Sequence, residues 1–216
     1  PLPDELMFLE HHNAIQKTTD TTLQDKVIVI TGATSGVGYE ALKRIAHNPV
    51  RIFIVARNLH KAQVVKSELH HLPATIEFVI ADFSSLHEVR RAAVEIRSQT
   101  QKIDILINCA GLHSTKRILT NDGHELVFAV NHLASFLFTQ LLLDTLKASF
   151  PSKILNINSE GHRFNGLDIT DLDWQKRHYT GLRGYGASKT AQLLCTWELN
   201  DQLAGTGVTI NAMHPG

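Results

Sequence analysis

The chain has 216 residues with 21 basic and 21 acidic side chains, so its formal net charge is zero. This balance argues against a dedicated nucleic-acid-binding protein, which normally carries a large basic excess, and against a polybasic membrane anchor. Hydrophobic residues make up 43% of the chain, which is enough for a buried core and excludes a mainly disordered protein.

The cysteines and the apolar runs indicate where the protein resides. Cys109 and Cys195 are too few for a disulfide framework and form no CxxC pair, so we expect a reducing, cytoplasmic environment. The best candidate for a spanning helix, residues 134–143, is shorter than the ~18 residues required, so we expect no transmembrane segment. The N-terminus shows no signal-peptide pattern, and its start on Pro1 rather than Met suggests a processed or incomplete chain.

Strand-like and helix-like segments alternate along most of the chain. Residues 1–25 are polar and irregular, and we interpret them as an N-terminal extension with one short helix around Asp4 to His12. From residue 26 onward, short β-branched runs predict strands at 27–30, 51–55, 75–80, 103–107, 154–157 and 208–212. Helical periodicity between them predicts helices at 38–46, 59–69, 86–96, 121–147 and 185–203.

This alternation predicts the fold class. Strand, helix and strand in repetition are typical of an α/β, Rossmann-like doubly wound parallel sheet in the order 3-2-1-4-5-6, with helices on both faces. The continuous apolar run Val27 to Ile30 is typical of a parallel strand that is buried on both faces. Ser84-Ser85 and Asp122 are candidate helix starts, each followed by an acid. Without an internal linker, residues 26–216 form one predicted domain.

A glycine-rich loop, Thr31 to Gly38, joins the first expected strand to the first expected helix. Glycines at such a turn let the backbone approach a pyrophosphate, and the helix N-terminus supplies free N–H donors. The spacing, Gly-xxx-Gly-x-Gly, differs from the usual dinucleotide fingerprint, and a plain tight turn is the alternative. The position between strand and helix favours dinucleotide binding.

The residues after the next two strands indicate which dinucleotide is bound. The second strand leads into Arg57-Asn58, where NAD-binding folds place an acid for the adenosine ribose. A guanidinium at this place suits a ribose 2′-phosphate, so NADP(H) is favoured over NAD(H), with a solvated arginine as the alternative. Asp82, before Phe83, is a candidate acceptor for the adenine amino group, or an ordinary helix cap.

Tyr185 and Lys189 stand four residues apart at the start of the last expected helix, and therefore share one helix face. The lysine ammonium stabilises a phenolate, which produces a proton donor and acceptor that works near neutrality. This spacing also occurs by chance, so the pair alone is weak evidence. Its order after the glycine-rich loop, the Asn108 to Gly111 segment and Ser159 strengthens it.

In this order, the motifs resemble those of the short-chain dehydrogenase/reductase family from about Lys26 to Gly216. Thr31 to Gly38 matches the family's TGxxxGxG loop, and Tyr185 to Lys189 matches its YxxxK motif. Asn108 to Gly111 resembles its NNAG motif, with Cys109 in place of the second Asn. The expected cofactor-binding residues are Gly32, Thr34, Ser35, Gly36, Val37, Gly38, Arg57, Asn58, Asp82, Phe83, Asn108, Ala110, Gly111, Tyr185, Lys189, Pro215 and Gly216.

The resemblance implies a catalytic set of four residues for NADP(H)-dependent interconversion of a carbonyl and an alcohol. Tyr185 would exchange a proton with the substrate oxygen while a hydride moves at the nicotinamide. Lys189 would hold the nicotinamide ribose, and Ser159 would donate a hydrogen bond to the substrate oxygen. Asn131 would fix a water in a proton relay, and the Pro215-Gly216 turn would lie beside the nicotinamide.

The long interval between Ser159 and Tyr185, which contains Asp171-Leu-Asp-Trp174, resembles the retinol dehydrogenase and WW-domain oxidoreductase branch. That branch implies a small lipophilic substrate of the retinoid, steroid or lipid aldehyde and ketone type. In the family, the helices that carry Asn131 and Tyr185 often form a dimer face, so a homodimer is one expectation. Family members continue beyond Pro215-Gly216, so we interpret the chain as C-terminally truncated and lacking its substrate segment.

Other functions fit the sequence less well. A non-catalytic NADP-binding sensor or scaffold need not retain Ser159, Tyr185 and Lys189 together. A sugar-nucleotide epimerase or dehydratase resembles the chain less, because its loop usually reads Gly-xx-Gly-xx-Gly. The adjacent pairs His11-His12 and His70-His71 lack a second ligand pair, so we expect no metal site. The absence of a Gly-x-Ser-x-Gly elbow argues against a serine hydrolase.

Overall fold

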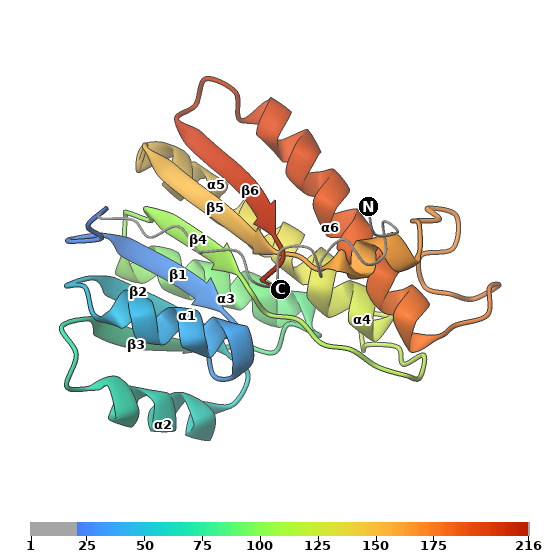
Figure 1. Ribbon diagram of the computed structural model, residues 1–216, viewed down its shortest axis with the longest axis horizontal. Coiled ribbons are helices and arrows are strands. Elements are labelled where there is room, and N and C mark those ends of the chain that lie inside the picture. Colours follow the sequence, from blue (N-terminus) through green and yellow to red (C-terminus); the bar gives the residue numbers. More distant parts are fainter. Residues whose placement is uncertain (1–20, 216) are drawn as a thin grey trace, which may run out of the picture.

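The computed structural model describes residues 21–215, so Gly216 and the expected helix around Asp4 to His12 lie outside the described residues. Within this range, six strands form one parallel sheet in the order β3-β2-β1-β4-β5-β6 (Figure 1). The predicted doubly wound fold and its strand order are therefore confirmed. The strands are β1 (Val27–Thr31), β2 (Arg51–Ala56), β3 (Thr75–Ile80), β4 (Ile105–Asn108), β5 (Ser152–Ile157) and β6 (Val208–Met213).

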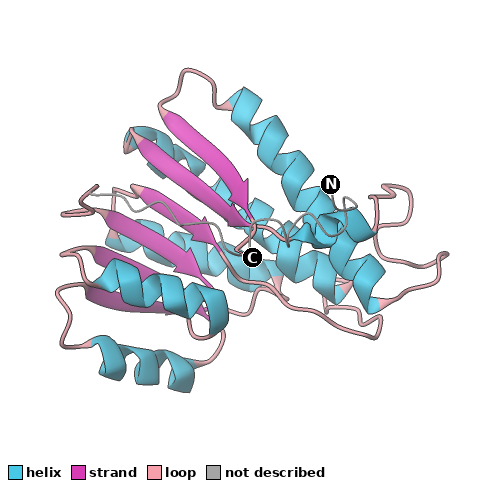
Figure 2. Cartoon of the chain, in the orientation of Figure 1, coloured by secondary structure: helices cyan, strands magenta, loops and turns pink. Residues whose placement is uncertain are grey.

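Helices cover both faces of the sheet (Figure 2). Successive residues of β1 point to opposite faces: Ile28 belongs to one apolar cluster and Val29 to the other. The first cluster includes residues of α1 and α2, and the second includes residues of α3, α5 and α6. Burial on both faces is the reason β1 is continuously apolar. The helices are α1 (Gly36–Ala46), α2 (Leu59–Leu69), α3 (Leu86–Gln99), α5 (Ser135–Ala148) and α6 (Gly181–Gln202).

Three helices begin at residues other than those predicted, and one of them, α1, begins at Gly36 rather than at residue 38. The last helix, α6, begins at Gly181 rather than Tyr185, and Thr180 caps it by accepting the Arg183 N–H at 3.3 Å. The long helix begins after Glu125, not at residue 121. Asp122 does not cap that helix, because its carboxylate accepts the Leu86 N–H at 2.8 Å, at the start of α3. Tertiary contacts thus decide helix starts that local capping patterns do not distinguish.

The long helix has three parts: α4 (Leu126–Phe128), a π-helical stretch η2 (Ala129–Ala134), and α5. By length and composition this helix, Leu126–Ala148, is apolar enough to cross a membrane, with a mean hydropathy of 1.8 over its best window, 61% of which is buried. We expected no such segment because small polar residues such as Ser135 interrupt the apolar run. These residues lower the mean hydropathy only a little, so a criterion based on the mean includes the whole helix. A buried core helix passes the same test, and here Phe138 and Leu142 are fully buried in the core.

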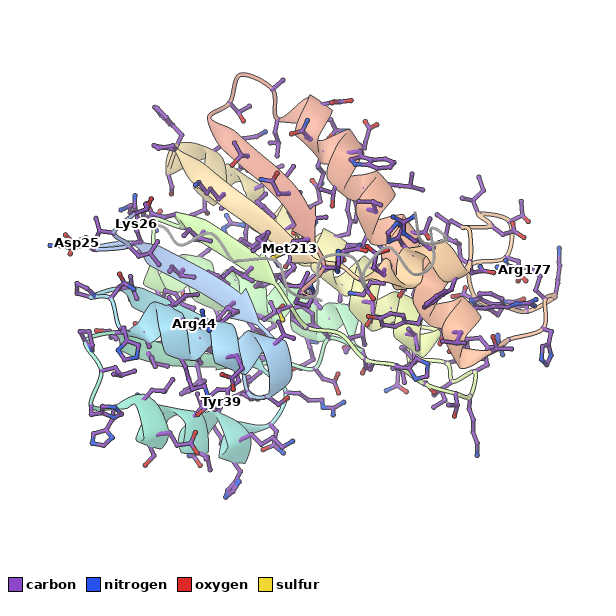
Figure 3. The ribbon with its side chains drawn as sticks, in the orientation of Figure 1. Asp25, Lys26, Tyr39, Arg44, Arg177 and Met213 are labelled. Atoms are coloured by element: carbon purple, nitrogen blue, oxygen red, sulfur yellow. The ribbon has the colours of Figure 1, made fainter. Side chains whose placement is uncertain are left out.

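The carboxyl ends of the strands meet at one edge of the sheet (Figure 1). Figure 3 shows Met213, the last residue of β6, near the middle of the molecule at this edge. Asp25 and Lys26, just before β1, lie at the opposite end of the sheet (Figure 3). Open α/β sheets bind ligands at the carboxyl ends of their strands. The fold therefore gathers at one edge the motifs that lie far apart in the sequence.

Candidate active site

A cavity of about 870 Å³ lies at the carboxyl edge of the sheet, a volume typical of a small-molecule or cofactor site. Most of the predicted cofactor-binding residues line it, together with Ser159 of the predicted catalytic set. These cofactor-binding residues are Gly32, Thr34, Ser35, Gly36, Val37, Gly38, Arg57, Asn58, Asp82, Phe83, Ala110, Gly111, Tyr185, Lys189 and Pro215.

The glycine-rich loop packs directly against the loop that follows β4. Gly32 has φ +69°, and a Cβ on it would lie 2.7 Å from the Ala110 Cα, so only glycine fits here. A Cβ on Gly38 would lie 2.6 Å from the Gly32 carbonyl oxygen. Thr31 Oγ1 accepts the N–H groups of Cys109 and Ala110 at 3.0 and 2.9 Å. The two loops thus form one continuous wall of the cavity, with backbone exposed to a ligand.

The N-terminus of α1 is available to an anion. Its N-cap residue, Ser35, makes no side-chain hydrogen bond to the helix, and the first turn carries no acidic residue. Ser35 to Gly38 line the cavity, so the free N–H donors and the positive end of the helix dipole lie at its wall. This arrangement favours a phosphate group.

Two cations, Arg57 and Lys61, line the cavity where β2 leads into α2. Arg57 is exposed and makes no hydrogen bond or ion pair with any residue in the described part of the chain, and Lys61 makes no ion pair there. Asn58 caps α2 by accepting the Lys61 N–H at 2.9 Å. Sequence reasoning missed Lys61, although the Asn58 cap places it in the first turn of the helix that follows Arg57.

Asp82 and Phe83 follow β3 at the cavity wall. The Asp82 carboxylate accepts the Ser84 N–H at 2.8 Å, while Ser85 caps α3 by accepting the Glu88 N–H at 3.3 Å. Asp82 therefore stabilises the turn. The alternative prediction, that Asp82 caps the following helix, is wrong, because Ser85 caps α3. The Phe83 ring packs edge-on against Phe138, with ring centroids 5.4 Å apart, and fixes this turn against the core.

Tyr185 and Lys189 lie together on α6, with the lysine Nζ 5.7 Å from the centroid of the tyrosine ring. Lys189 is 5% exposed and donates a hydrogen bond to the Ile157 carbonyl at 2.8 Å. Burial lowers the pKa of Lys189 to about 8. The backbone of Gly161 packs against the tyrosine ring, since a Cβ there would lie 2.7 Å from its Cε1. A cation and a phenol thus share one end of the cavity.

Ser159 lies at the same end of the cavity, at the start of the short 3-10 helix η3 (Glu160–Phe164). Its Oγ accepts the Gly161 N–H at 3.0 Å, which leaves the hydroxyl proton to donate to a ligand. Sequence reasoning did not include Glu160, which also lines the cavity and pairs with His214 at 3.1 Å. This contact joins the segment after β6 to the segment that carries Ser159.

Two predicted residues, Asn131 and Asn108, lie behind the cavity rather than in its lining. Asn131 is fully buried; its amide donates to the Leu112 carbonyl at 3.0 Å and to Ser188 Oγ at 3.1 Å, and its oxygen accepts the Leu112 N–H at 2.8 Å. The Asn108 amide donates to the side chains of Thr139 and Asn156. Asn131 thus fixes the loop after β4 to α6, and Asn108 joins β4 to its neighbours.

The remaining histidines and cysteines form no metal-binding cluster among residues 21–215. No group of three or more His, Cys, Asp or Glu side chains in this range is arranged to hold a metal ion. His70 and His71 contact each other edge to face, while His11 and His12 lie outside the described residues. Cys109 lines the cavity, and burial raises the pKa of its thiol.

Burial of Lys189 predicts a pH-dependent stability. Its folded-state pKa of about 8 lies below the ordinary 10.5, so between these values the unfolded chain binds the proton more tightly. The buried ammonium of Lys189 therefore lowers the free energy of unfolding by its full amount below about pH 8, and this loss disappears as the pH rises towards 10.5. We therefore compare wild type with Lys189→Met by urea denaturation of the cofactor-free proteins. Across this pH range, the free energy of unfolding of the wild type should rise by at least about 1 kcal/mol relative to that of the variant. A constant difference would mean that Lys189 titrates as an exposed lysine.

Comparison with known proteins gives matches along almost the whole described chain. The family model for short chain dehydrogenases matches residues 26–216. Human retinol dehydrogenase 13 is 39% identical over 201 residues, covering 90% of this chain and 60% of that protein. The WW domain-containing oxidoreductase of Gallus gallus is 36% identical over 205 residues, covering 90% of this chain and 49% of that protein.

A solved structure agrees with these matches. The crystal structure of an uncharacterized protein from Mycobacterium paratuberculosis has a TM-score of 0.79 and 30% sequence identity, covering 90% of this chain and 69% of that chain. The chain spans about 60% of the length of the retinol dehydrogenases that it matches. Fold, motif order and sequence identity all indicate the same group of proteins.

Proposed function

Because the chain belongs to the short-chain dehydrogenase family, we propose that it is an NADP(H)-dependent oxidoreductase that interconverts a carbonyl and an alcohol. One observation carries the proposal: Tyr185, Lys189 and Ser159 line the same cavity as the open N-terminus of α1. A phosphate site and a proton-transfer group in one cavity are the two parts that nicotinamide chemistry requires from a protein.

The residues of the cavity fit a nicotinamide dinucleotide phosphate. The free N–H groups of α1 would bind the pyrophosphate, and Arg57 and Lys61 would bind the 2′-phosphate by charge-assisted hydrogen bonds. Asp82 would accept a hydrogen bond from the adenine, and Lys189 would hold the nicotinamide ribose. When bound, the nicotinamide supplies or accepts the hydride. NADP(H) is favoured over NAD(H) because no acid adjoins Arg57 in the sequence at the end of β2.

Tyr185, Lys189 and Ser159 have separate roles in this mechanism. Tyr185 would give its phenolic proton to the substrate oxygen during reduction and take it back during oxidation. The Lys189 ammonium would stabilise the phenolate that remains, and Ser159 would donate a hydrogen bond to the oxygen where negative charge develops. Asn131 would act as a positioning residue, because the hydrogen bonds of its buried side chain already fix Leu112 and Ser188.

The substrate is proposed to be small and lipophilic, such as a retinoid, a steroid or a lipid aldehyde or ketone. Leu112, Val130 and Phe164 line the cavity with apolar surface, and Phe164 is 54% exposed. The similarity to human retinol dehydrogenase 13 supports the same substrate class. Because the chain spans about 60% of that protein, the activity and the substrate both belong to the proposal.

We also propose that two copies associate through α5 and α6. Phe136, Leu194 and Trp197 are large apolar side chains of these helices, and each is more than a third exposed. Such exposed apolar side chains favour association when they form a continuous patch. Sedimentation at several protein concentrations would measure the oligomeric state. A cytoplasmic location stays a prediction from the sequence.

The test of the proposed function is reduction of a panel of lipophilic aldehydes and ketones by the purified protein with each cofactor. We expect NADPH to be oxidised at least about tenfold faster than NADH, because only NADPH offers a 2′-phosphate to Arg57 and Lys61. Equal rates would contradict the NADP(H) preference. Tight NADPH binding without reduction of any member of the panel would instead favour the non-catalytic sensor.

A further inference from the structure

The segment between η3 and α6, residues 165–180, forms a compact structure that we call the brace. The buried Asp171 carboxylate accepts the N–H groups of Gln175 and Arg177 at 2.7 and 3.0 Å and pairs with the Arg177 guanidinium at 3.3 Å. That guanidinium lies 4.1 Å from the centroid of the Trp174 ring, and Trp174 is 4% exposed. Figure 3 shows Arg177 on this outlying part of the molecule. These contacts fix the shape of the brace.

The brace contacts the residues just before the long helix. The Asp173 carboxylate accepts the Glu125 N–H at 2.9 Å, and the Asp173 carbonyl accepts Arg117 Nε at 2.7 Å. The Tyr179 hydroxyl lies 3.1 Å from the Ser114 carbonyl and 3.2 Å from the Glu125 carboxylate. Tyr179 therefore joins the brace to the loop after β4 and to the start of the helix that carries Asn131.

Glu125 is a fully buried carboxylate without a role in the proposed mechanism. Its two oxygens accept the N–H groups of Val127 and Phe128 at 2.9 and 2.8 Å, so Glu125 caps the long helix. Desolvation raises the pKa of Glu125. A buried acid must be fully hydrogen-bonded to be tolerated, and the Tyr179 hydroxyl supplies the contact that the helix does not.

Tyr179 also packs against the first turn of α6, directly before Tyr185. A Cβ on Gly184 would lie 2.5 Å from Tyr179 Cε2, so the tyrosine ring lies directly against the glycine backbone. Gly181 approaches the neighbouring loop in the same way, since a Cβ on it would lie 2.8 Å from His113 Cε1. The His113 ring in turn lies 5.9 Å from the Tyr185 ring. The start of α6 is thus held between the brace and the loop after β4.

We propose that Tyr179 and Glu125 are positioning residues. They hold Tyr185, on α6, at a fixed position relative to the long helix that carries Asn131. The inference rests on the proposed function, because these two residues would keep Tyr185 in the position from which it transfers a proton to the substrate. Misplacement of a reacting group by about 1 Å can cost up to about 10²-fold in rate without affecting remote binding contacts. The pair therefore acts on turnover rather than on cofactor affinity.

The first test compares Tyr179→Phe with Tyr39→Phe as a matched control. Tyr39 also donates its hydroxyl proton to a carboxylate, that of Glu68, but it joins α1 to α2 and does not line the cavity. We expect Tyr179→Phe to lower kcat about tenfold, with the Kd for NADPH within about twofold of wild type. Tyr39→Phe should change neither, and Glu125→Gln should lower kcat at least as much as Tyr179→Phe.

Hydrogen exchange provides a readout that does not depend on turnover. Loss of the Tyr179 hydroxyl should speed amide exchange at residues 181–185 and at Val127 and Phe128, whereas Tyr39→Phe should not. An unchanged kcat in Tyr179→Phe, or a Kd for NADPH that rises in proportion to the loss of rate, would overturn the positioning role. If the wild type reduced no carbonyl, the proposed function would fail and hydrogen exchange alone would test whether Tyr179 holds the start of α6. Unchanged exchange in Tyr179→Phe would overturn that positioning role.

Discussion

Replacing Tyr185 by Phe is expected to lower the rate of NADPH-dependent carbonyl reduction by about 10³-fold, because the variant has no proton to give to the substrate oxygen. The aromatic ring should keep its place against the Gly161 backbone, so the cavity should remain intact. NADPH should therefore bind within about threefold of wild type in a fluorescence titration. Initial rates of NADPH oxidation at saturating cofactor measure the loss.

The control for this variant is Tyr39→Phe, which also removes a tyrosine hydroxyl but on α1, outside the cavity lining. It should turn over at the wild-type rate. Turnover retained by Tyr185→Phe would exclude Tyr185 as the proton donor. A loss of rate accompanied by an equal loss of NADPH affinity would show that the substitution damages the cofactor site, and would leave the donor to be sought among the other residues of the cavity.

Replacing Arg57 by Ala is expected to weaken NADPH binding about 30-fold while NADH binding stays within about twofold, because charge-assisted hydrogen bonds contribute about 1.5–3 kcal/mol. The exposed Arg57 has no partner among residues 21–215, so its removal breaks no internal contact there. Lys61→Ala should give a smaller change in the same direction, because an ammonium binds phosphate as a point charge rather than as a fork. Equilibrium titration with both cofactors at one ionic strength measures the selectivity.

Arg44→Ala is the matched control for Arg57→Ala. Arg44 is an exposed arginine on α1 (Figure 3). It does not line the cavity, and its removal changes the net charge by the same amount as Arg57→Ala. It should leave both affinities unchanged. If Arg57→Ala weakened NADPH and NADH equally, Arg57 would act on a part that the two cofactors share. If Arg57→Ala left both affinities unchanged, the 2′-phosphate would be assigned to Lys61.

The fold follows from the sequence because its signals are local and repeated. Buried parallel strands require continuous β-branched runs such as Val27 to Ile30, and the glycines after the first strand lie where two loops must touch. The start of α6 was placed wrongly for a physical reason: Gly181 and Gly184 disfavour a helix locally. In the folded chain they let His113 and Tyr179 approach the helix backbone. This packing outweighs helix propensity and is not visible in a local window.

The candidate site was predictable where function depends on backbone and charge near strand ends. Arg57, Ser159 and Tyr185 all reach the cavity because each follows a strand or lies on a helix at the carboxyl edge of the sheet. Asn131 occupies the expected position in the chain, but its side chain points into the helix layer, where it bonds to Ser188. The sequence indicates Glu125 only as an acid that follows Asp122 near a helix start, because its contact with the distant Tyr179 leaves no local signal.

Transfer of deuterium from NADPH to a carbonyl substrate tests the proposed reaction most directly. The protein is incubated with a lipophilic aldehyde and NADPH deuterated at the transferable nicotinamide position, and the alcohol is analysed by mass spectrometry. We expect one deuterium on the carbinol carbon of each product molecule, and Tyr185→Phe should form about 10³-fold less of this product in the same time. An alcohol without deuterium, or NADPH consumed without any alcohol, would contradict hydride transfer at this site.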